Sequence, residues 1–262
     1  MRVGVIGGGG GIATALQRAG IAVIGCAAGG RTPDPGIETV GGYADYLEAL
    51  DYPRRYVLDL EAGPGIDPVI DEAYQTMEPG DVVIDPTLSY WGDTLRRYRR
   101  MRHRSLFYQD VACIAGPEGP SLVVAGDAKG LPLSHDILEA WAAPGKLQSV
   151  AGAGFAHYLA VVEAAAEIAE SSLASEVAQL IEAYPGEVTT EAKAAFCPPH
   201  GIRGPGDGIG RAGWLLDDAV RLEAAVPLLA QALMQRLAEA LEAHASSPPP
   251  PRGPFVHPDD IL

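Results

Sequence analysis

A run of five glycines directly follows a short hydrophobic segment at the start of the chain. Residues 2–6 (RVGVI) are mainly apolar and β-branched, Gly7–Gly11 come next, and IATALQRAG then has the apolar spacing of a helix that ends at Gly20. The order is therefore strand, glycine turn and helix. A second strand-like segment, IAVIGC at 21–26, follows at once, so the opening of the chain predicts a βαβ unit.

The same alternation continues along the first half of the chain. Further strand-like runs at 56–60, 81–85, 105–111 and 121–126 alternate with helical stretches around 66–77, 91–103 and 133–143. Alternation of this kind specifies a largely parallel sheet with helices on both faces. The predicted fold class is α/β, with an N-terminal Rossmann-type doubly wound sheet.

A long helical segment begins after Gly154. Residues 155–184 contain neither Gly nor Pro, and apolar residues recur there at spacings of three and four, which predicts a helix with one apolar face. A second amphipathic stretch covers 214–245. We therefore predict three parts: a dinucleotide-binding domain at 1–150, an all-helical dimerisation and substrate domain at 151–245, and a Pro-rich C-terminal tail at 246–262.

Composition excludes several functional classes. The 262 residues are 47% hydrophobic and 20% charged, which is typical of a folded protein. With 34 acidic against 19 basic residues, the net charge of -15 would repel a nucleic-acid backbone. No apolar run approaches the ~18 residues of a membrane span. The cysteines Cys26, Cys113 and Cys197 show no metal-ligand spacing, which indicates a reduced, cytoplasmic protein without a metal.

The glycine turn is the candidate cofactor site. Such a turn lets the backbone approach a pyrophosphate, which also meets the N–H groups at the start of the helix. One register of the GxGxxG pattern gives Gly7, Gly9 and Ile12, and a shifted register gives Gly8, Gly10 and Ala13. The predicted cofactor-binding residues here are Gly7, Gly8, Gly9, Gly10, Gly11 and Ile12. The alternative is a glycine turn that binds nothing.

The loop after the second strand favours NADP over NAD. Cys26 and Ala27 stand where an acidic residue would hold the 2′-hydroxyl of NAD. Arg31 and Thr32 follow a few residues later, and an arginine in this loop can pair with a 2′-phosphate. The alternative is that Arg31 is an ordinary solvated residue. Asp59, at the end of the third predicted strand, is an unexpected acidic residue with no assigned role.

Several segments together resemble the 6-phosphogluconate dehydrogenase and β-hydroxyacid dehydrogenase superfamily, to which imine reductases are related. The segments are GVIGGGG, MEPGDVVID at 77–85, YQDVACIAGPEG at 108–119, GAG at 152–154 and GIGRAGWLLDDAVRLEAAVPLLAQALMQRL at 208–237. The resemblance implies a nucleotide domain followed by a helical domain, with the active site beside the helix that starts after GAG.

The catalytic residues of these dehydrogenases are replaced in this chain. The family's lysine falls on Tyr158, its following asparagine on Val162, its histidine on Val161, its substrate-binding serine on Ile114 and the asparagine of its GGNS turn on Leu88. Oxidation of a hydroxyl needs a base and donors for the developing carbonyl, which Val, Ile and Leu do not provide. Decarboxylating dehydrogenation of 6-phosphogluconate is therefore not expected.

Tyr158 fits a reduction better than an oxidation. A phenol has an ordinary pKa of about 10, so at neutral pH it is a proton donor. Imine reductases, by resemblance, carry a Tyr or Asp at this helix position and use NADPH. His157 is the second catalytic candidate, and since it lies about 100° round the helix only one of the two can point squarely into the cleft. The alternative for Tyr158 is a buried aromatic without chemistry.

The resemblance also implies residues that bind substrate. They are Ser89 after the MEPGDVVID segment, Ile114 and Gly116 in the following loop, and Arg252 and His257 in the tail. In the family, a comparable tail reaches the active site of a partner subunit. We expect a homodimer, because the helical part is too small to cover its own helices.

Two hypotheses follow. The first is an NADP-dependent oxidoreductase that reduces an imine or carbonyl of a small, possibly anionic metabolite. The second is a degenerate family member that binds a dinucleotide or metabolite without redox turnover, or a non-redox enzyme that reuses the cleft.

Overall fold

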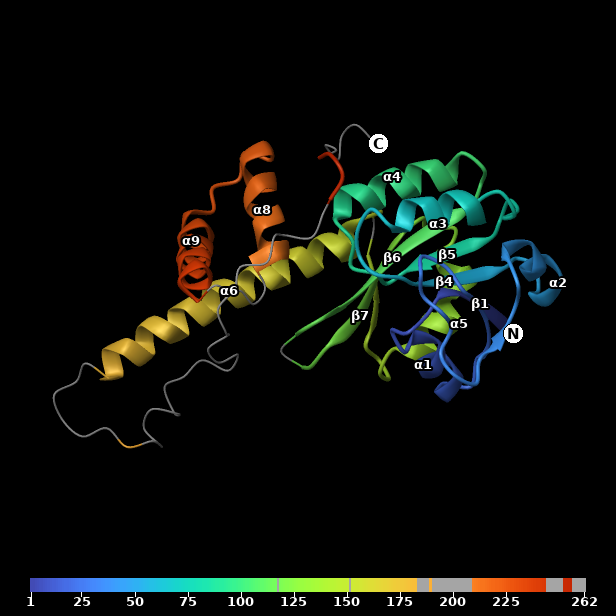
Figure 1. Cartoon of the computed structure of the whole chain (residues 1–262), viewed down its shortest axis with the longest axis horizontal. Coiled ribbons are helices and arrows are strands. Elements are labelled where there is room, and N and C mark those ends of the chain that lie inside the picture. Colours follow the sequence, from blue (N-terminus) through green and yellow to red (C-terminus); the bar gives the residue numbers. More distant parts are fainter. Residues whose placement is uncertain (117, 151, 183–188, 190–208, 244–251, 256–262) are drawn as a thin grey trace. The chain divides into compact units, whose positions relative to one another are not determined.

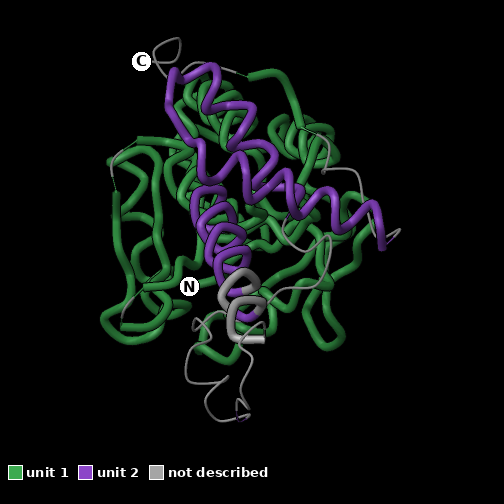
Figure 2. Tube along the Cα trace, turned by 90° about the vertical axis from the view of Figure 1, so that its left-hand side faces the viewer, with its two compact units in different colours: residues 1–160, 251–262 green, residues 161–250 purple. Residues whose placement is uncertain are grey.

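The structure, a computed structural model, describes residues 1–116, 118–150, 152–182, 189, 209–243 and 252–255. It divides into two compact units (Figure 2): residues 1–160 together with 251–262, and residues 161–250. The long helix α6 (Phe155–Glu182) begins in the first unit and continues in the second.

The first unit is built on one sheet, which has eight strands within the described residues. Their order is β3-β2-β1-β4-β5-β6-β7-β8. The strands are β1 (Arg2–Gly7), β2 (Ala22–Cys26), β3 (Glu38–Thr39), β4 (Arg55–Asp59), β5 (Val82–Asp85), β6 (Phe107–Ile114), β7 (Ser121–Gly126) and β8 (Leu147–Ser149). Neighbouring strands are parallel except β6 and β7, which are antiparallel.

Helices cover both faces of the sheet (Figure 1). One face carries α1 (Ile12–Arg18) and α5 (Leu131–Trp141), and the other carries α3 (Ile66–Ala73) and α4 (Trp91–Arg102). A 3-10 turn η1 (Tyr43–Asp45) leads into the short helix α2 (Tyr46–Ala49). The predicted doubly wound α/β fold is therefore confirmed.

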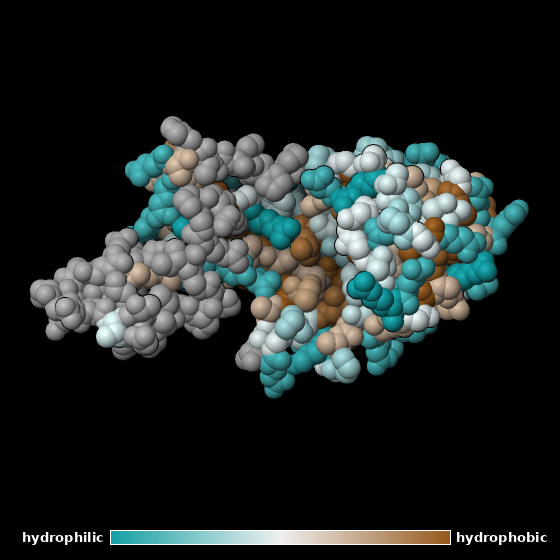
Figure 3. Space-filling model, turned by 60° about the horizontal axis from the view of Figure 1, so that its bottom comes forward, coloured by the Kyte–Doolittle hydropathy of each residue, from teal (hydrophilic) through white to brown (hydrophobic). Residues whose placement is uncertain are grey.

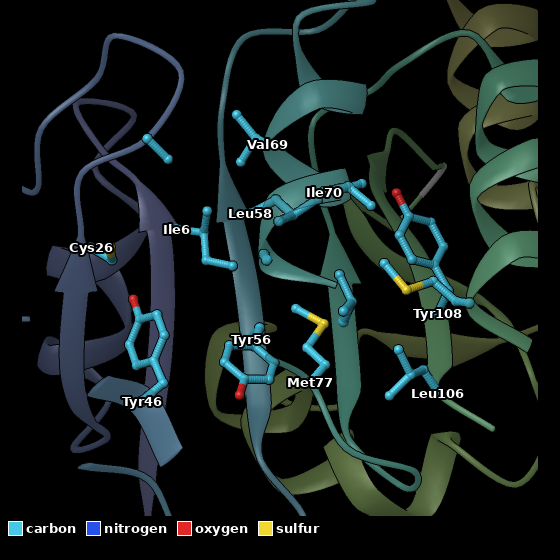
Figure 4. Packing of buried hydrophobic residues seen from close by; sticks show 14 of the residues in the cluster. Ile6, Cys26, Tyr46, Tyr56, Leu58, Val69, Ile70, Met77, Leu106 and Tyr108 are labelled. Atoms are coloured by element: carbon cyan, nitrogen blue, oxygen red, sulfur yellow. The ribbon is translucent and has the colours of Figure 1, made fainter. Parts of the chain in front are cut away.

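Two apolar clusters hold these layers together. Figure 4 shows the cluster under α3 and α4, which is built from strand residues such as Leu58 and helix residues such as Ile70. The hydroxyl group of the buried Tyr46 donates to the carbonyl oxygen of Val5, at 2.8 Å, so its polar end is satisfied inside the cluster. The strands are buried on both faces because helices lie on each side, which accounts for their continuous Val, Ile and Leu content.

The carboxyl ends of the parallel strands meet at one edge of the sheet. Gly7 of β1 pairs with Asp59 of β4, and Asp85 of β5 pairs with Asp110 of β6. In open α/β sheets this edge is where ligands bind. The glycine turn, three aspartates and the start of α6 are all anchored here.

The second unit is helical in its described part, as predicted. It contains the remainder of α6, then α8 (Ile209–Arg221) and α9 (Pro227–Glu242). α8 and α9 contact each other.

Figure 3 shows how polar and hydrophobic residues are distributed over one face of the molecule. Polar residues surround smaller hydrophobic areas on the face seen in Figure 3. No helix among the described residues is both long and apolar enough to cross a bilayer.

Candidate active site

The glycine turn between β1 and α1 depends on residues without a side chain. Gly7, Gly8, Gly9 and Gly11 have φ values of 99°, 158°, 79° and 77°, in the region that other residues rarely adopt. A Cβ atom at Gly8 would collide with the carbonyl group of Thr32. The turn therefore allows both a tight backbone and a close approach of the β2–β3 loop.

Arg31 and Thr32 lie against this turn, although they follow it by twenty residues or more in sequence. Ala28 and Arg31 form a pair of backbone hydrogen bonds of 3.0 and 2.9 Å around Gly29 and Gly30, which both have positive φ. This tight turn directs the Arg31 side chain back, where its Nε donates to the carbonyl oxygen of Gly8 at 2.5 Å. The structure thus brings together the residues predicted to bind the cofactor.

Two carboxylates that the sequence did not assign to the site hold N–H groups of the turn. Gly9 N donates to Asp34 Oδ1 at 3.1 Å, and Gly10 N donates to Asp59 Oδ2 at 3.2 Å. Asp34 Oδ2 also accepts from the Thr14 hydroxyl at 3.0 Å. Burial raises the pKa of Asp59, and this is partly offset by the hydrogen bond from Gly10 and the charge of Arg31.

A pocket of about 380 Å³ opens beside the end of β2. It lies between the β2–β3 loop and the start of α3, and its residues are Cys26, Ala27, Ala28, Gly29, Gly41, Gly42, Tyr43, Gly65, Pro68, Val69 and Glu72. Its volume suits one nucleoside-sized group. The backbone of the turn and this pocket fit the dinucleotide that such a fold implies. Asp34 and Asp59 accept from two of the N–H groups that a pyrophosphate would use.

A second polar cluster lies at the ends of β5 and β6. Asp85 Oδ1 accepts from the Thr87 N–H at 2.9 Å and from the Thr87 hydroxyl at 2.6 Å, and its other oxygen accepts from the Tyr108 hydroxyl. Burial alone would raise the pKa of Asp85, but His157, Arg97 and these hydrogen bonds bring it below its ordinary value. Asp85 is therefore a buried anion that fixes the loop after β5.

That loop carries two residues singled out by the sequence. Ser89 is fully buried, and its Oγ lies 2.8 Å from the Thr87 Oγ1. Leu88 has a φ of 52°, a left-handed conformation that is unusual for leucine and that asparagine tolerates better. Leu88 and Ile114 pack against a small apolar cluster that includes Ala112 and Ala156.

Asp110 fixes the start of α6. Its Oδ1 accepts from Gly154 N at 2.8 Å, and its Oδ2 accepts from Ala156 N at 2.9 Å and from His157 N at 3.2 Å. These bonds satisfy backbone N–H groups at the helix start that have no partner within the helix. The first turn of α6 is therefore locked to β6.

His157 and Tyr158 lie in different surroundings. The His157 ring is fully buried, with Nδ1 2.8 Å from the Thr94 hydroxyl and Nε2 3.0 Å from the Asp85 carbonyl oxygen. Tyr158 is half-buried, and its ring meets the Trp91 ring edge-on at 5.6 Å between centroids. Of these two neighbours, Tyr158 is the one with a partly exposed side chain.

The loop after β6 offers no charged group at the predicted substrate residues. Gly116 is exposed and its carbonyl oxygen accepts from Gly119 N at 2.9 Å. A pocket of about 270 Å³ on this side has mainly apolar walls and is lined by Pro86, Leu88, Val111, Ala112, Cys113, Pro120, Leu122, Trp141, Ala142 and Ala143.

The described part of the tail lies against the start of α4. The Arg252 guanidinium lies 4.7 Å above the Tyr90 ring, and Phe255 meets Trp91 at 5.8 Å. Gly253 N donates to Asp93 Oδ1 at 3.2 Å. Trp91 therefore contacts both the tail and Tyr158. His257, the other tail residue predicted to bind substrate, lies outside the described residues.

No side-chain cluster suited to a metal occurs in the described residues, where groups of three or more His, Cys, Asp or Glu side chains are lacking. A doubly wound sheet with a glycine turn after its first strand defines the class of dinucleotide-binding domains. The family model for the NAD-binding domain of 6-phosphogluconate dehydrogenase matches residues 2–154. The chain belongs to this family.

The curated relatives share part of their length with this chain. The 6-phosphogluconate dehydrogenase of Chlamydia pneumoniae is 30% identical over 142 residues, which is 50% of this chain and 29% of that protein. The enzyme of Raoultella planticola is 28% identical over 160 residues, or 57% of this chain and 36% of the relative. The chain thus spans about a third of the length of these relatives.

Solved structures show the same fold at low sequence identity. The 3-hydroxyisobutyrate dehydrogenase of Mycobacterium tuberculosis has a TM-score of 0.67 at 16% identity and covers 94% of this chain and 96% of its own. The 6-phosphogluconate dehydrogenase of Plasmodium falciparum has a TM-score of 0.70 at 17% identity. The match covers 93% of this chain and 63% of that chain. An imine reductase from Myxococcus stipitatus has a TM-score of 0.54 at 15% identity. The match covers 94% of this chain and 96% of that chain.

Proposed function

We propose that this protein is an NADP-dependent oxidoreductase that reduces an imine or carbonyl group of a small, polar or anionic metabolite. The turn Gly7–Gly11 and the N–H of Ile12 would hold the pyrophosphate, and Arg31 with Thr32 would meet the 2′-phosphate. When bound, NADPH supplies the hydride. Membership of a family of dehydrogenases and the position of Arg31 on the turn support this proposal.

The observation that carries the proposal is the placement of Tyr158. By resemblance it stands at the position of the lysine of the related dehydrogenases. It lies on the first turn of α6 and keeps part of its side chain exposed beside Trp91. Its phenol would donate a proton to the substrate as the double bond is reduced. His157 is the second catalytic candidate, and from its buried position we propose that it holds the α6 turn that carries Tyr158.

The substrate would meet a mostly apolar wall and the Arg252 guanidinium of the tail. Ile114 and Gly116 would border it on one side, while the fully buried Ser89 would hold the loop after β5 through Thr87. Arg252 with His257 would bind an anionic group. We propose that the protein acts as a homodimer, as its relatives' use of the tail implies. An apolar wall at Leu88 and Ile114 suits a substrate with fewer hydroxyl groups than a sugar acid.

A second candidate is a family member that binds a dinucleotide or metabolite without turnover. The packing of Leu88 and Ile114 in an apolar cluster, where the family has polar residues, favours it. The two candidates differ in whether bound NADPH is consumed.

The test is a panel of cyclic imines and small oxo acids, with NADPH consumption followed by absorbance. Tyr158→Phe should lower turnover ~10²-fold or more, a typical contribution of general acid catalysis, without changing NADPH affinity. The control is Tyr74→Phe, which removes a phenol hydroxyl at the end of α3. NADPH binding without consumption across the panel would favour the second candidate.

A further inference from the structure

We propose that Asp59 and Asp34 are internal anions that compete with the cofactor's pyrophosphate for the glycine turn and thereby set a low dinucleotide affinity. The inference rests on the proposed function, because it concerns the same cofactor site. It also gives Asp59 a role that the sequence alone left open.

Asp59 is fixed in this position by both its backbone and its side chain. Its carbonyl oxygen accepts from Gly8 N at 2.9 Å, and its carboxylate accepts from Gly10 N at 3.2 Å. A Cβ atom at Gly10 would collide with Asp59 Oδ1, so the carboxylate lies directly over the turn. The residue is only 3% exposed. A pyrophosphate at this N–H would meet a negative charge that cannot move far away.

Asp34 accepts from the neighbouring N–H group, that of Gly9, but its side chain is less buried than that of Asp59. It lies in the loop between β2 and β3 and is half-buried, with bonds to Gly9 N and to the Thr14 hydroxyl. It can leave the turn if the loop moves. The cation nearest the turn, Arg31, donates to the Gly8 carbonyl oxygen through Nε. The two carboxylates therefore outnumber the single guanidinium around the turn.

The pyrophosphate is common to NADPH and NADH, whereas the 2′-phosphate is present in NADPH alone. A carboxylate opposed to the pyrophosphate should weaken both cofactors equally, while Arg31 should affect NADPH more. Adenosine has no phosphate, so its affinity should not depend on the charge of Asp59. These ligands separate the effect on the turn from any effect on the nucleoside pocket.

The experiment is calorimetric titration of the full chain and its Asp59→Asn, Asp34→Asn and Asp51→Asn variants with NADPH, NADH and adenosine. Asp51 is an exposed carboxylate before β4, at the opposite edge of the sheet, so its variant controls for net charge. Asp59→Asn should tighten both cofactors about tenfold or more, in view of the strength of charge interactions at short range. Asp34→Asn should have a smaller effect in the same direction, and Asp51→Asn none.

Equal NADPH affinity in all four proteins would overturn the inference and leave the proposed function standing. If none of the four proteins binds NADPH or NADH, the proposed function fails and the inference fails with it. Thermal melting of each ligand-free variant shows that it is folded.

If Asp59→Asn does not fold, the pH dependence of NAD⁺ binding to the unaltered protein tests the same inference. Burial raises the pKa of Asp59 above its ordinary value, so its charge is lost as the pH falls through that raised pKa. NAD⁺, which lacks the 2′-phosphate, should therefore bind more tightly as the pH falls through that raised pKa. The charged groups that face Asp59 are Asp34 and Arg31. If Asp59 is the group that titrates, Asp34→Asn should show the same rise in NAD⁺ affinity toward acid pH. Affinity that stays level or falls toward acid pH contradicts the inference.

Discussion

At the scale of single residues, His157 and Tyr158 are neighbours in sequence that lie in different surroundings. His157 is enclosed between Thr94 and the Asp85 carbonyl group, whereas Tyr158 keeps part of its ring exposed. The helical angle between them predicts that only one side chain can face the cleft. Which one does so depends on the buried hydrogen-bond partners of His157, and these lie 63 and 72 residues away in sequence.

This division predicts opposite effects on stability. His157→Ala should lower the free energy of unfolding by about 2–4 kcal/mol, because it opens a cavity and removes the buried hydrogen bonds to the Thr94 hydroxyl and the Asp85 carbonyl oxygen. Tyr158→Phe should change it by less than about 0.5 kcal/mol, since a partly exposed hydroxyl is lost. Urea denaturation of both variants measures the difference. Equal losses would mean that Tyr158 is also a structural residue.

The acidic residues of the site were the least predictable from sequence. Asp59 stands out in the sequence as an acidic residue at the end of a predicted strand. Asp34 and Asp110 carry no such signal, because aspartates are common in loops and at strand ends. Their roles depend on which N–H groups the fold brings to them. The glycine turn and Arg31 could be predicted, since glycine spacing and a cation after the second strand have a local meaning.

At the scale of elements, Asp110 links the sheet to the helix that carries Tyr158. Three N–H groups at the start of α6 donate to its carboxylate. Asp110→Ala should therefore lower the free energy of unfolding by about 2–4 kcal/mol, because buried donors lose their acceptor. Turnover should fall at the same time.

Two variants complete this test, again by urea denaturation. Asp110→Asn keeps one acceptor oxygen, so it should lower the free energy of unfolding less than Asp110→Ala does. Asp51→Ala, at an exposed position, should change the free energy of unfolding by about 0.5 kcal/mol or less. If Asp110→Ala is as stable as Asp51→Ala, the helix start is held by other contacts.

Most elements of the first unit could be predicted because their apolar runs are long. The exceptions are short or polar: β3 has two residues, Glu38–Thr39, and β8 has three, Leu147–Ser149. The last amphipathic stretch, predicted over 214–245, consists of two helices. α8 starts earlier, at Ile209, and Pro227 begins α9, as expected of a residue without an N–H.

At the scale of the whole molecule, the described part of the tail, residues 252–255, belongs to the N-terminal unit although it comes late in sequence. Residues 252–255 contact Tyr90, Trp91, Asp93 and Arg96 at the start of α4. Deleting 248–262 should raise the KM for an anionic substrate tenfold or more without unfolding the protein, because Arg252 and His257 are removed while the apolar clusters stay intact.

Steady-state kinetics and thermal melting check this prediction. Deletion of 258–262 alone, which keeps both tail residues, is the control. An unchanged KM in the longer deletion would place the substrate's anionic group elsewhere.

The most direct test of the account is a titration of the protein with NADPH and NADH, followed by quenching of its tryptophan fluorescence. NADPH should bind at least tenfold more tightly than NADH, since Arg31 lies on the glycine turn and a guanidinium group pairs with a 2′-phosphate, and Arg31→Ala should narrow this difference in affinity. Arg99→Ala, an exposed arginine of α4, should leave the difference unchanged. Equal affinity for the two cofactors, or no binding of either, would contradict the proposal that the protein is an NADP-dependent oxidoreductase.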